Sequence, residues 1–100
     1  MEFEFIEVME KLGLRKFPVN SQLFLKYGTM SIQASEFHYC TPRVSHLNLE
    51  DYITFEIGVI CDSRKVDEIL KPYHFDDIDG MKLYENVPIG LVEQVYQLLK

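Results

Sequence analysis

Hydrophobic and polar residues alternate most regularly between Asp51 and Cys61. Every second side chain on one face of this run is apolar, and these are Ile53, Phe55, Ile57, Val59 and Cys61. β-Branched and aromatic residues at every second position are typical of a half-buried strand, because successive side chains point to opposite faces of the pleat. The pattern predicts a central strand over residues 51–61.

Both ends of the chain follow a helical period instead. Apolar residues near the N-terminus recur at i, i+3, i+4 and i+7, at Phe5, Val8, Met9 and Leu12. This spacing predicts a helix over residues 2–12, ended by Gly13 in the left-handed conformation, although the first five residues also alternate as a strand would. A second helix is predicted to begin at Pro88, with its apolar stripe at Leu91, Val92, Val95, Leu98 and Leu99.

Two strands joined by a short turn are predicted before the central strand. Residues 22–27 and 30–40 have strand chemistry, and Gly28 between them suits the positive φ of a hairpin. Apolar residues change parity between Ala34 and Phe37, so the second strand either contains a bulge or leaves the sheet. Residues 41–50 contain Pro42 and are mostly polar, which predicts a loop.

The segment after the central strand predicts a short helix and a last strand. Asp62 or Ser63 can cap a helix that ends at Lys71-Pro72. Residues 72–80 have turn chemistry, and residues 81–85 form a short strand. A right-handed crossover would make that strand parallel to the central one, and an antiparallel edge position is the alternative.

These elements predict one α+β domain over residues 1–100. The expected order is α-β-β-β-α-β-α, with a four-stranded, mostly antiparallel sheet. Packing the helices on one face of the sheet in two layers is the simplest way to bury every apolar stripe.

The composition indicates that the hydrophobic core alone can stabilise the domain. Of the 100 residues, 47% are hydrophobic, which is enough for one core without a cofactor, metal or disulfide. Two cysteines are too few for a secreted disulfide framework, and no secretory leader or segment of about 20 apolar residues is evident. We therefore expect a cytoplasmic protein that does not bind membranes.

The negative charge is concentrated in the second half of the chain. The net charge is −6; residues 1–50 carry five Lys/Arg and six Asp/Glu, and residues 51–100 carry five and ten. Direct nucleic-acid binding is disfavoured, because affinity for phosphate backbones comes from clustered Lys and Arg. A basic protein partner fits this charge better.

The acidic run from Asp76 to Gly80 resembles a calcium loop only superficially. If Gly80 takes the sixth position, Phe75 occupies the first and Asn86 the last. Both anchoring carboxylates are then missing. The run is better explained as a solvated turn.

Four residues could form a reactive pocket, namely His38, Cys40, Glu56 and His74. His38 and Cys40 share a strand face, but no Cys-x-x-Cys pair supports a zinc site. Cys40 in a strand lacks the helix N-terminus that activates many catalytic thiols, and Cys61 points inward. No metal ligand, cofactor or catalytic residue is assigned, and a Cys/His-dependent enzyme or small-molecule sensor is the alternative function.

The leading hypothesis is a non-catalytic interaction module, such as an adaptor, inhibitor or regulatory protein. Its partner-binding residues would combine carboxylates with aromatic anchors of the kind found at interface hot spots. These residues are Asp67, Glu68, Tyr73, Phe75, Asp76, Asp77 and Asp79. A further hypothesis is a nucleic-acid mimic that inhibits a nucleic-acid-binding protein, as a phage-encoded inhibitor would. A homodimer through a sheet edge or face is also compatible with the fold.

Overall fold

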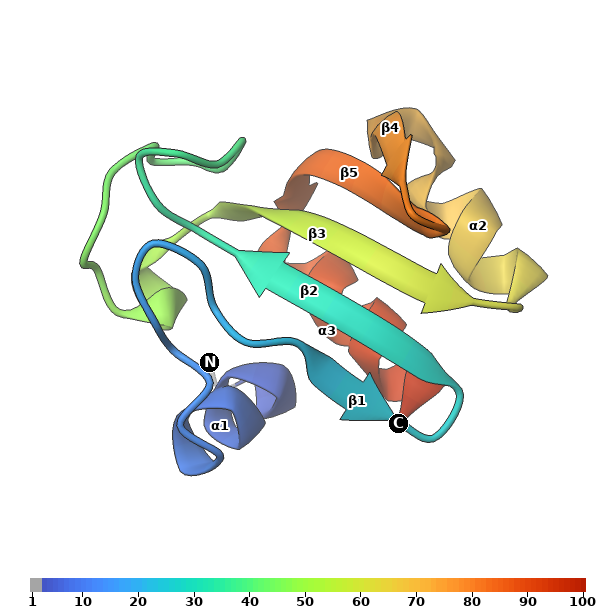
Figure 1. The fold of residues 1–100 in the computed structure, drawn as a ribbon, viewed down its shortest axis with the longest axis horizontal. Coiled ribbons are helices and arrows are strands. Elements are labelled where there is room, and N and C mark those ends of the chain that lie inside the picture. Colours follow the sequence, from blue (N-terminus) through green and yellow to red (C-terminus); the bar gives the residue numbers. More distant parts are fainter. Residues whose placement is uncertain (1–2) are drawn as a thin grey trace.

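The computed structural model describes residues 3–100, which form a compact α+β domain (Figure 1). The three α-helices are α1 (Glu4–Lys11), α2 (Arg64–Leu70) and α3 (Ile89–Leu99). The five strands are β1 (Leu23–Leu25), β2 (Gly28–Gln33), β3 (Thr54–Cys61), β4 (His74–Ile78) and β5 (Met81–Pro88). Two short 3-10 helices are η1 (Leu49–Asp51) and η2 (Lys71–Tyr73).

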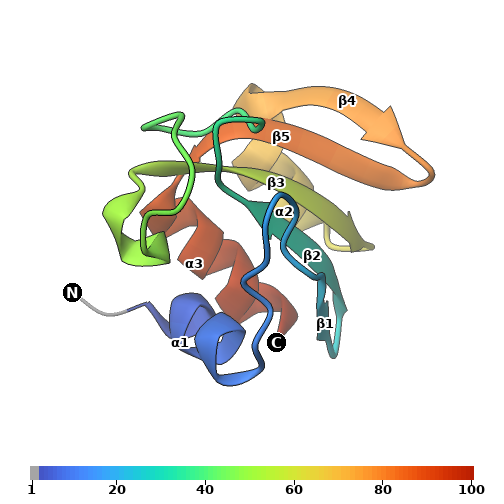
Figure 2. The same cartoon turned by 60° about the vertical axis from the view of Figure 1, so that its left-hand side comes forward.

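The strands form one antiparallel sheet with the order β1-β2-β3-β5-β4. Helices α1 and α3 lie against one face of this sheet (Figure 2). The predicted α+β class and central strand are therefore confirmed, because β3 is the middle strand of the five.

The prediction of four strands is wrong, and so is the predicted element order. Residues 74–78, expected to be part of a turn, form the edge strand β4. β5 pairs antiparallel with β3 and lies inside the sheet, so the parallel crossover and the edge position are both wrong. The missed signal is Asp79-Gly80, whose positive φ values of 50° and 83° make the two-residue turn between β4 and β5.

The predicted second strand ends earlier than expected. β2 stops at Gln33, so the change of parity marks the point where the chain leaves the sheet. The following irregular segment returns to the sheet at the start of β3, where Thr41 forms an isolated bridge with Thr54.

The predicted helix ends agree with local capping chemistry. Gly13 has a φ of +66° just beyond α1, as expected, while Glu2 of the predicted range lies outside the described residues. The Ser63 hydroxyl accepts a hydrogen bond from the Val66 amide at 3.2 Å and caps α2. Pro88 is the N-cap of α3.

The predicted hairpin before the central strand is confirmed, but the reason for its glycine is different. The turn falls at Lys26-Tyr27, and Gly28 does not have positive φ. A β-carbon at Gly28 would lie 2.6 Å from the backbone carbonyl oxygen of Ile60. The glycine therefore permits close approach of β2 to β3.

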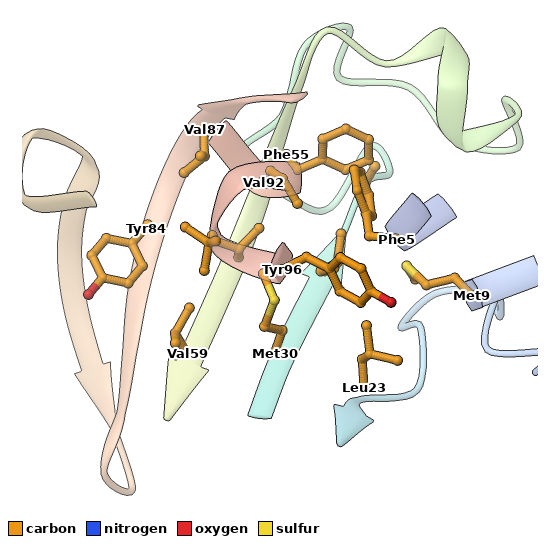
Figure 3. Close-up of a cluster of buried hydrophobic side chains, with 14 of the residues drawn as sticks. Phe5, Met9, Leu23, Met30, Phe55, Val59, Tyr84, Val87, Val92 and Tyr96 are labelled. Carbon is orange, nitrogen blue, oxygen red and sulfur yellow. The ribbon is translucent and has the colours of Figure 1, made fainter. Parts of the chain in front are cut away.

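The core lies between the helices and the inner face of the sheet (Figure 3). Phe5 of α1 contacts Phe55 of β3 edge to face, with ring centroids 5.8 Å apart. Tyr84 and Val87 of β5 extend the core toward α2, which contributes Val66 and Leu70. No helix within residues 3–100 is long and apolar enough to cross a membrane.

Candidate functional site

No helix covers the face of the sheet opposite α1 and α3 (Figure 2). A row of mostly apolar side chains crosses this face, interrupted at β2 by Thr29. In this row Phe24 pairs with Thr29, and Thr29 pairs with Ile60. Val59 pairs with Lys82, so Ile60 lies beside Met81, which in turn pairs with Ile78. Phe24, Ile60 and Ile78 are 78%, 44% and 53% exposed. We call this surface, together with Leu83, the open face.

A shallow hollow lies at the β5 side of the open face. Its volume is about 280 Å³, and its lining residues are Gln22, Ile60, Ile78, Asp79, Met81 and Leu83. A β-carbon at Gly58 would lie 2.4 Å from the Met81 sulfur and 3.1 Å from a methyl carbon of Leu83. The glycine therefore lets both side chains lie flat against the sheet, which keeps the hollow shallow.

Carboxylates outnumber cations around the open face. Asp76 pairs with Leu83 and so shares its face, and Asp79 lines the hollow from the hairpin turn. The Glu56 carboxylate accepts a hydrogen bond from the Tyr39 amide at 3.0 Å. A cation beside this border is Arg43, whose guanidinium lies 5.1 Å from the Tyr39 ring centroid. The border of the open face is therefore acidic.

An aromatic pair lies at one corner of this border. β4 has an extra residue between His74 and Asp76, which is the bulged Phe75. The Phe75 ring contacts Tyr39 edge to face, with centroids 5.2 Å apart. The Asn86 amide donates to the Tyr39 carbonyl at 3.0 Å, which fixes the loop beside β5. The pair joins the irregular segment to the sheet.

The edge strand β4 is poorly suited to pairing with another strand. Its Asp77 amide donates to the side chain of the preceding residue, Asp76, at 2.8 Å. The bulge at Phe75 interrupts the regular ladder, and all five residues of β4 are exposed. A short, charged and bulged edge resists addition of a further strand.

The seven residues predicted to bind a partner lie in different parts of the structure. Phe75, Asp76 and Asp79 lie at the border of the open face. Asp67 instead pairs with Lys82 at 3.4 Å, and Asp77 pairs with His74 at 2.9 Å, on the α2 side of the sheet. Glu68 is exposed on α2, and Tyr73 in η2 packs partly against the core. The set does not form one surface.

Sequence reasoning missed the apolar members of the open face. Ile60 lay on the second face of the predicted central strand, next to Gly58, and this was the available signal. Phe24 lies on β1 and Met81 on β5, and the sheet topology decides which face of each strand is uncovered. Their exposure could not be predicted before the faces were assigned.

His38 and Cys40 of the alternative pocket form a buried structural cluster. The Ser35 hydroxyl and the His38 Nδ1 are 2.7 Å apart, and the same hydroxyl accepts from the Phe37 amide at 3.0 Å. The Cys40 thiol donates to the Ser35 carbonyl at 3.3 Å. These bonds hold the tight turn that follows β2.

The electrostatics of this cluster favour neutral side chains. Burial raises the pKa of the Cys40 thiol and lowers the pKa of His38. The negative charge of Glu56 raises the pKa of both groups, but its carboxylate is already hydrogen-bonded to the Tyr39 amide. His74, the fourth predicted member, contacts Tyr84 and Asp77 in a different place. A neutral, buried thiol is a poor nucleophile.

No group of three or more His, Cys, Asp or Glu side chains within residues 3–100 could hold a metal ion. Comparison of the chain with known family models, curated proteins and solved structures yields no match.

Proposed function

We propose that this protein is a non-catalytic interaction module that binds a basic protein through the open face. The observation that carries the proposal is the exposed, mostly apolar row from Phe24 to Ile78, which no helix of residues 3–100 covers. Contiguous exposed apolar surface bordered by polar residues is typical of protein interfaces. The role as a binding module agrees with the sequence hypothesis, but the surface is a different one.

The open face has the anatomy of a binding surface. Its centre is apolar, and its border provides the Tyr39 and Phe75 rings, residue types common at interface hot spots. A hollow of about 280 Å³ beside Ile60 can receive an apolar side chain of a partner. The centre would supply affinity and the border would supply orientation.

Charge favours a basic partner over a second copy of the chain. Glu56, Asp76 and Asp79 would face the same acidic border if two open faces met. Like charges brought together at an interface oppose association, and opposite charges accelerate it. A partner with Lys or Arg around an apolar patch complements this surface.

Site-specific photo-crosslinking tests the proposal. Phe24 is replaced by the photoreactive analogue benzoylphenylalanine, and the protein is irradiated in an extract of its own cells. We expect a crosslink to a basic protein from position 24. The control places the same analogue at Leu12, which is 61% exposed at the end of α1. Equal crosslinking from the two positions would contradict the proposal.

Charge-neutral variants test the acidic border. Asp76→Asn with Asp79→Asn should weaken binding about tenfold or more, because two charges facing a basic surface are lost. The control pair, Asp51→Asn with Asp62→Asn, removes the same charge elsewhere and should retain binding. Competition by added DNA would instead support the nucleic-acid-mimic hypothesis, and a crosslinked product of twice the chain mass would support a homodimer.

A further inference from the structure

The corner of the open face at Tyr39 already holds a guanidinium. The Tyr39 ring is 42% exposed, and the Arg43 guanidinium lies 5.1 Å from its centroid. The Asn86 amide of β5 donates to the Tyr39 carbonyl at 3.0 Å, and the segment after β2 passes beside β5 on the side of the sheet away from α1 and α3 (Figure 2). A cation within about 6 Å of a tyrosine ring is attracted by the negative face of the ring. The chain itself therefore shows that this ring accepts a guanidinium.

Arg43 is weakly held in this position. Its Nε donates to the Glu36 carbonyl at 3.1 Å, and no other hydrogen bond or ion pair of Arg43 is found within residues 3–100. By contrast, the Arg15 guanidinium, which lies 5.7 Å from the Tyr52 ring centroid, donates to two backbone carbonyls. Arg15 is half-buried, whereas Arg43 is exposed. Arg43 is therefore a cation that a competitor can displace.

The surroundings of the Tyr39 ring favour a cation. The Phe75 ring, which is 37% exposed, contacts Tyr39 edge to face with centroids 5.2 Å apart. One oxygen of the Glu56 carboxylate accepts from the Tyr39 amide at 3.0 Å, and Glu56 has no ion pair among the described residues. Asp76 follows Phe75 in the sequence and shares the open face with Leu83. Two aromatic rings and two carboxylates thus border this corner.

Tyr27 provides a comparison without these surroundings. It is 62% exposed, and the Lys26 ammonium lies 5.3 Å from its ring centroid. The two residues are adjacent in the turn between β1 and β2, at the opposite edge of the sheet from β4. A cation over a ring is therefore present at both edges, but only Tyr39 combines it with a second ring and with Glu56.

We propose that the Tyr39 ring binds an arginine side chain of the basic partner, and that Arg43 occupies this position in the free protein. The inference rests on the proposed function and names the residue type that the acidic border selects. Arginine fits better than lysine because a guanidinium is planar, stacks on an aromatic face and keeps its N–H groups directed at carboxylates around the ring. Arg43 competes with the partner, so the free protein is partly self-inhibited at this corner.

Arg43→Gln separates the effect of the ring from the effect of charge. Removing a cation from an acidic border strengthens the binding of arginine and lysine alike. Vacating the ring face strengthens the binding of arginine more than that of lysine, so the preference for arginine should rise about twofold or more. Arg64→Gln removes the same charge from an exposed position on α2 and should leave the preference unchanged.

The experiment is an NMR titration of the ¹⁵N-labelled protein with a short peptide of alternating glycine and arginine, and with the same peptide carrying lysine in place of arginine. The Tyr39 amide reports directly on the site because it is bonded to Glu56. We expect saturable shifts at Tyr39, Glu56 and Phe75 and tighter binding of the arginine peptide. Tyr39→Leu should abolish this preference, whereas Tyr39→Phe should retain it. Tyr27→Leu is the matched control and should also retain it.

Equal affinity for the two peptides, or no saturable binding of the arginine peptide, would overturn the inference. A preference that survives Tyr39→Leu, or that is lost equally in Tyr27→Leu, would overturn it as well. The proposed function is tested separately by benzoylphenylalanine at position 24. If that position still crosslinks a basic protein when arginine is not preferred, the open face binds its partner without an arginine site at Tyr39.

Discussion

Two glycines in adjacent strands should tolerate the same substitution to different extents. At Gly58 an added β-carbon meets the Met81 sulfur at 2.4 Å, whereas at Gly28 it meets the Ile60 carbonyl oxygen at 2.6 Å. Met81 has a flexible side chain on an uncovered surface and can move into solvent. The Ile60 carbonyl belongs to the backbone of the central strand and cannot move alone.

The expected magnitudes follow from these neighbours. Gly→Ala in a compatible conformation stabilises by about 0.4–1 kcal/mol through the unfolded chain. For Gly58→Ala, lifting the end of Met81 costs about 0.8 kcal/mol per methylene-sized group exposed. The net change in unfolding free energy should stay within about 1 kcal/mol. For Gly28→Ala, overpacking typically costs about 1–3 kcal/mol, so this variant should be clearly less stable.

Urea unfolding followed by far-UV circular dichroism measures the difference, since the chain has no Trp for fluorescence. A gap of about 2 kcal/mol between the variants would separate their midpoints by about 1 M at a slope of about 2 kcal/mol per M. A loss above about 2 kcal/mol in Gly58→Ala would refute the argument. It would mean that Met81 is held in place and that the open face is more rigidly packed than an uncovered surface should be.

Three further predictions concern single side chains. Ser63→Ala removes the α2 cap and should lower the unfolding free energy by about 1 kcal/mol in urea titrations, whereas Ser63→Asp should preserve it. Burial lowers the pKa of His38, so its contribution to stability is present above about pH 6.5 and is lost as pH falls toward the lower folded value. His38→Gln should therefore flatten the dependence of unfolding free energy on pH below about 6.5, and an unchanged slope would contradict this assignment. The buried Cys40 thiol, whose pKa is raised by burial, should react with a disulfide reagent slowly in Cys61→Ser protein and rapidly after unfolding, and fast reaction of the folded variant would disprove its burial.

The predictions were most accurate where residues close in sequence determine the local structure. The alternation in residues 54–61, the cap at Ser63 and the left-handed Gly13 depend on neighbouring residues, and each is observed. β4 was missed because its carboxylates suggested a solvated turn. In an exposed edge strand, burial does not impose an apolar alternation, and only the Asp79-Gly80 turn indicated a hairpin.

The open face could not be predicted without knowing the sheet topology. An isolated strand shows two faces but not which one the helices cover, so Ile60 and Met81 could equally have been core residues. The predicted acidic set is divided between two faces for the same reason. Asp76 and Asp77 are adjacent in sequence, and the pleat places them on opposite faces of the sheet.

The bond between the Asp76 carboxylate and the Asp77 amide should limit how this protein assembles at high concentration. An exposed apolar sheet face would be hazardous beside a bare strand edge, because molecules could then stack face to face and grow edge to edge in the same assembly. The bulge and the carboxylate cap block growth in the second direction. The association proposed for the open face should therefore end at a discrete complex rather than extend into a fibre.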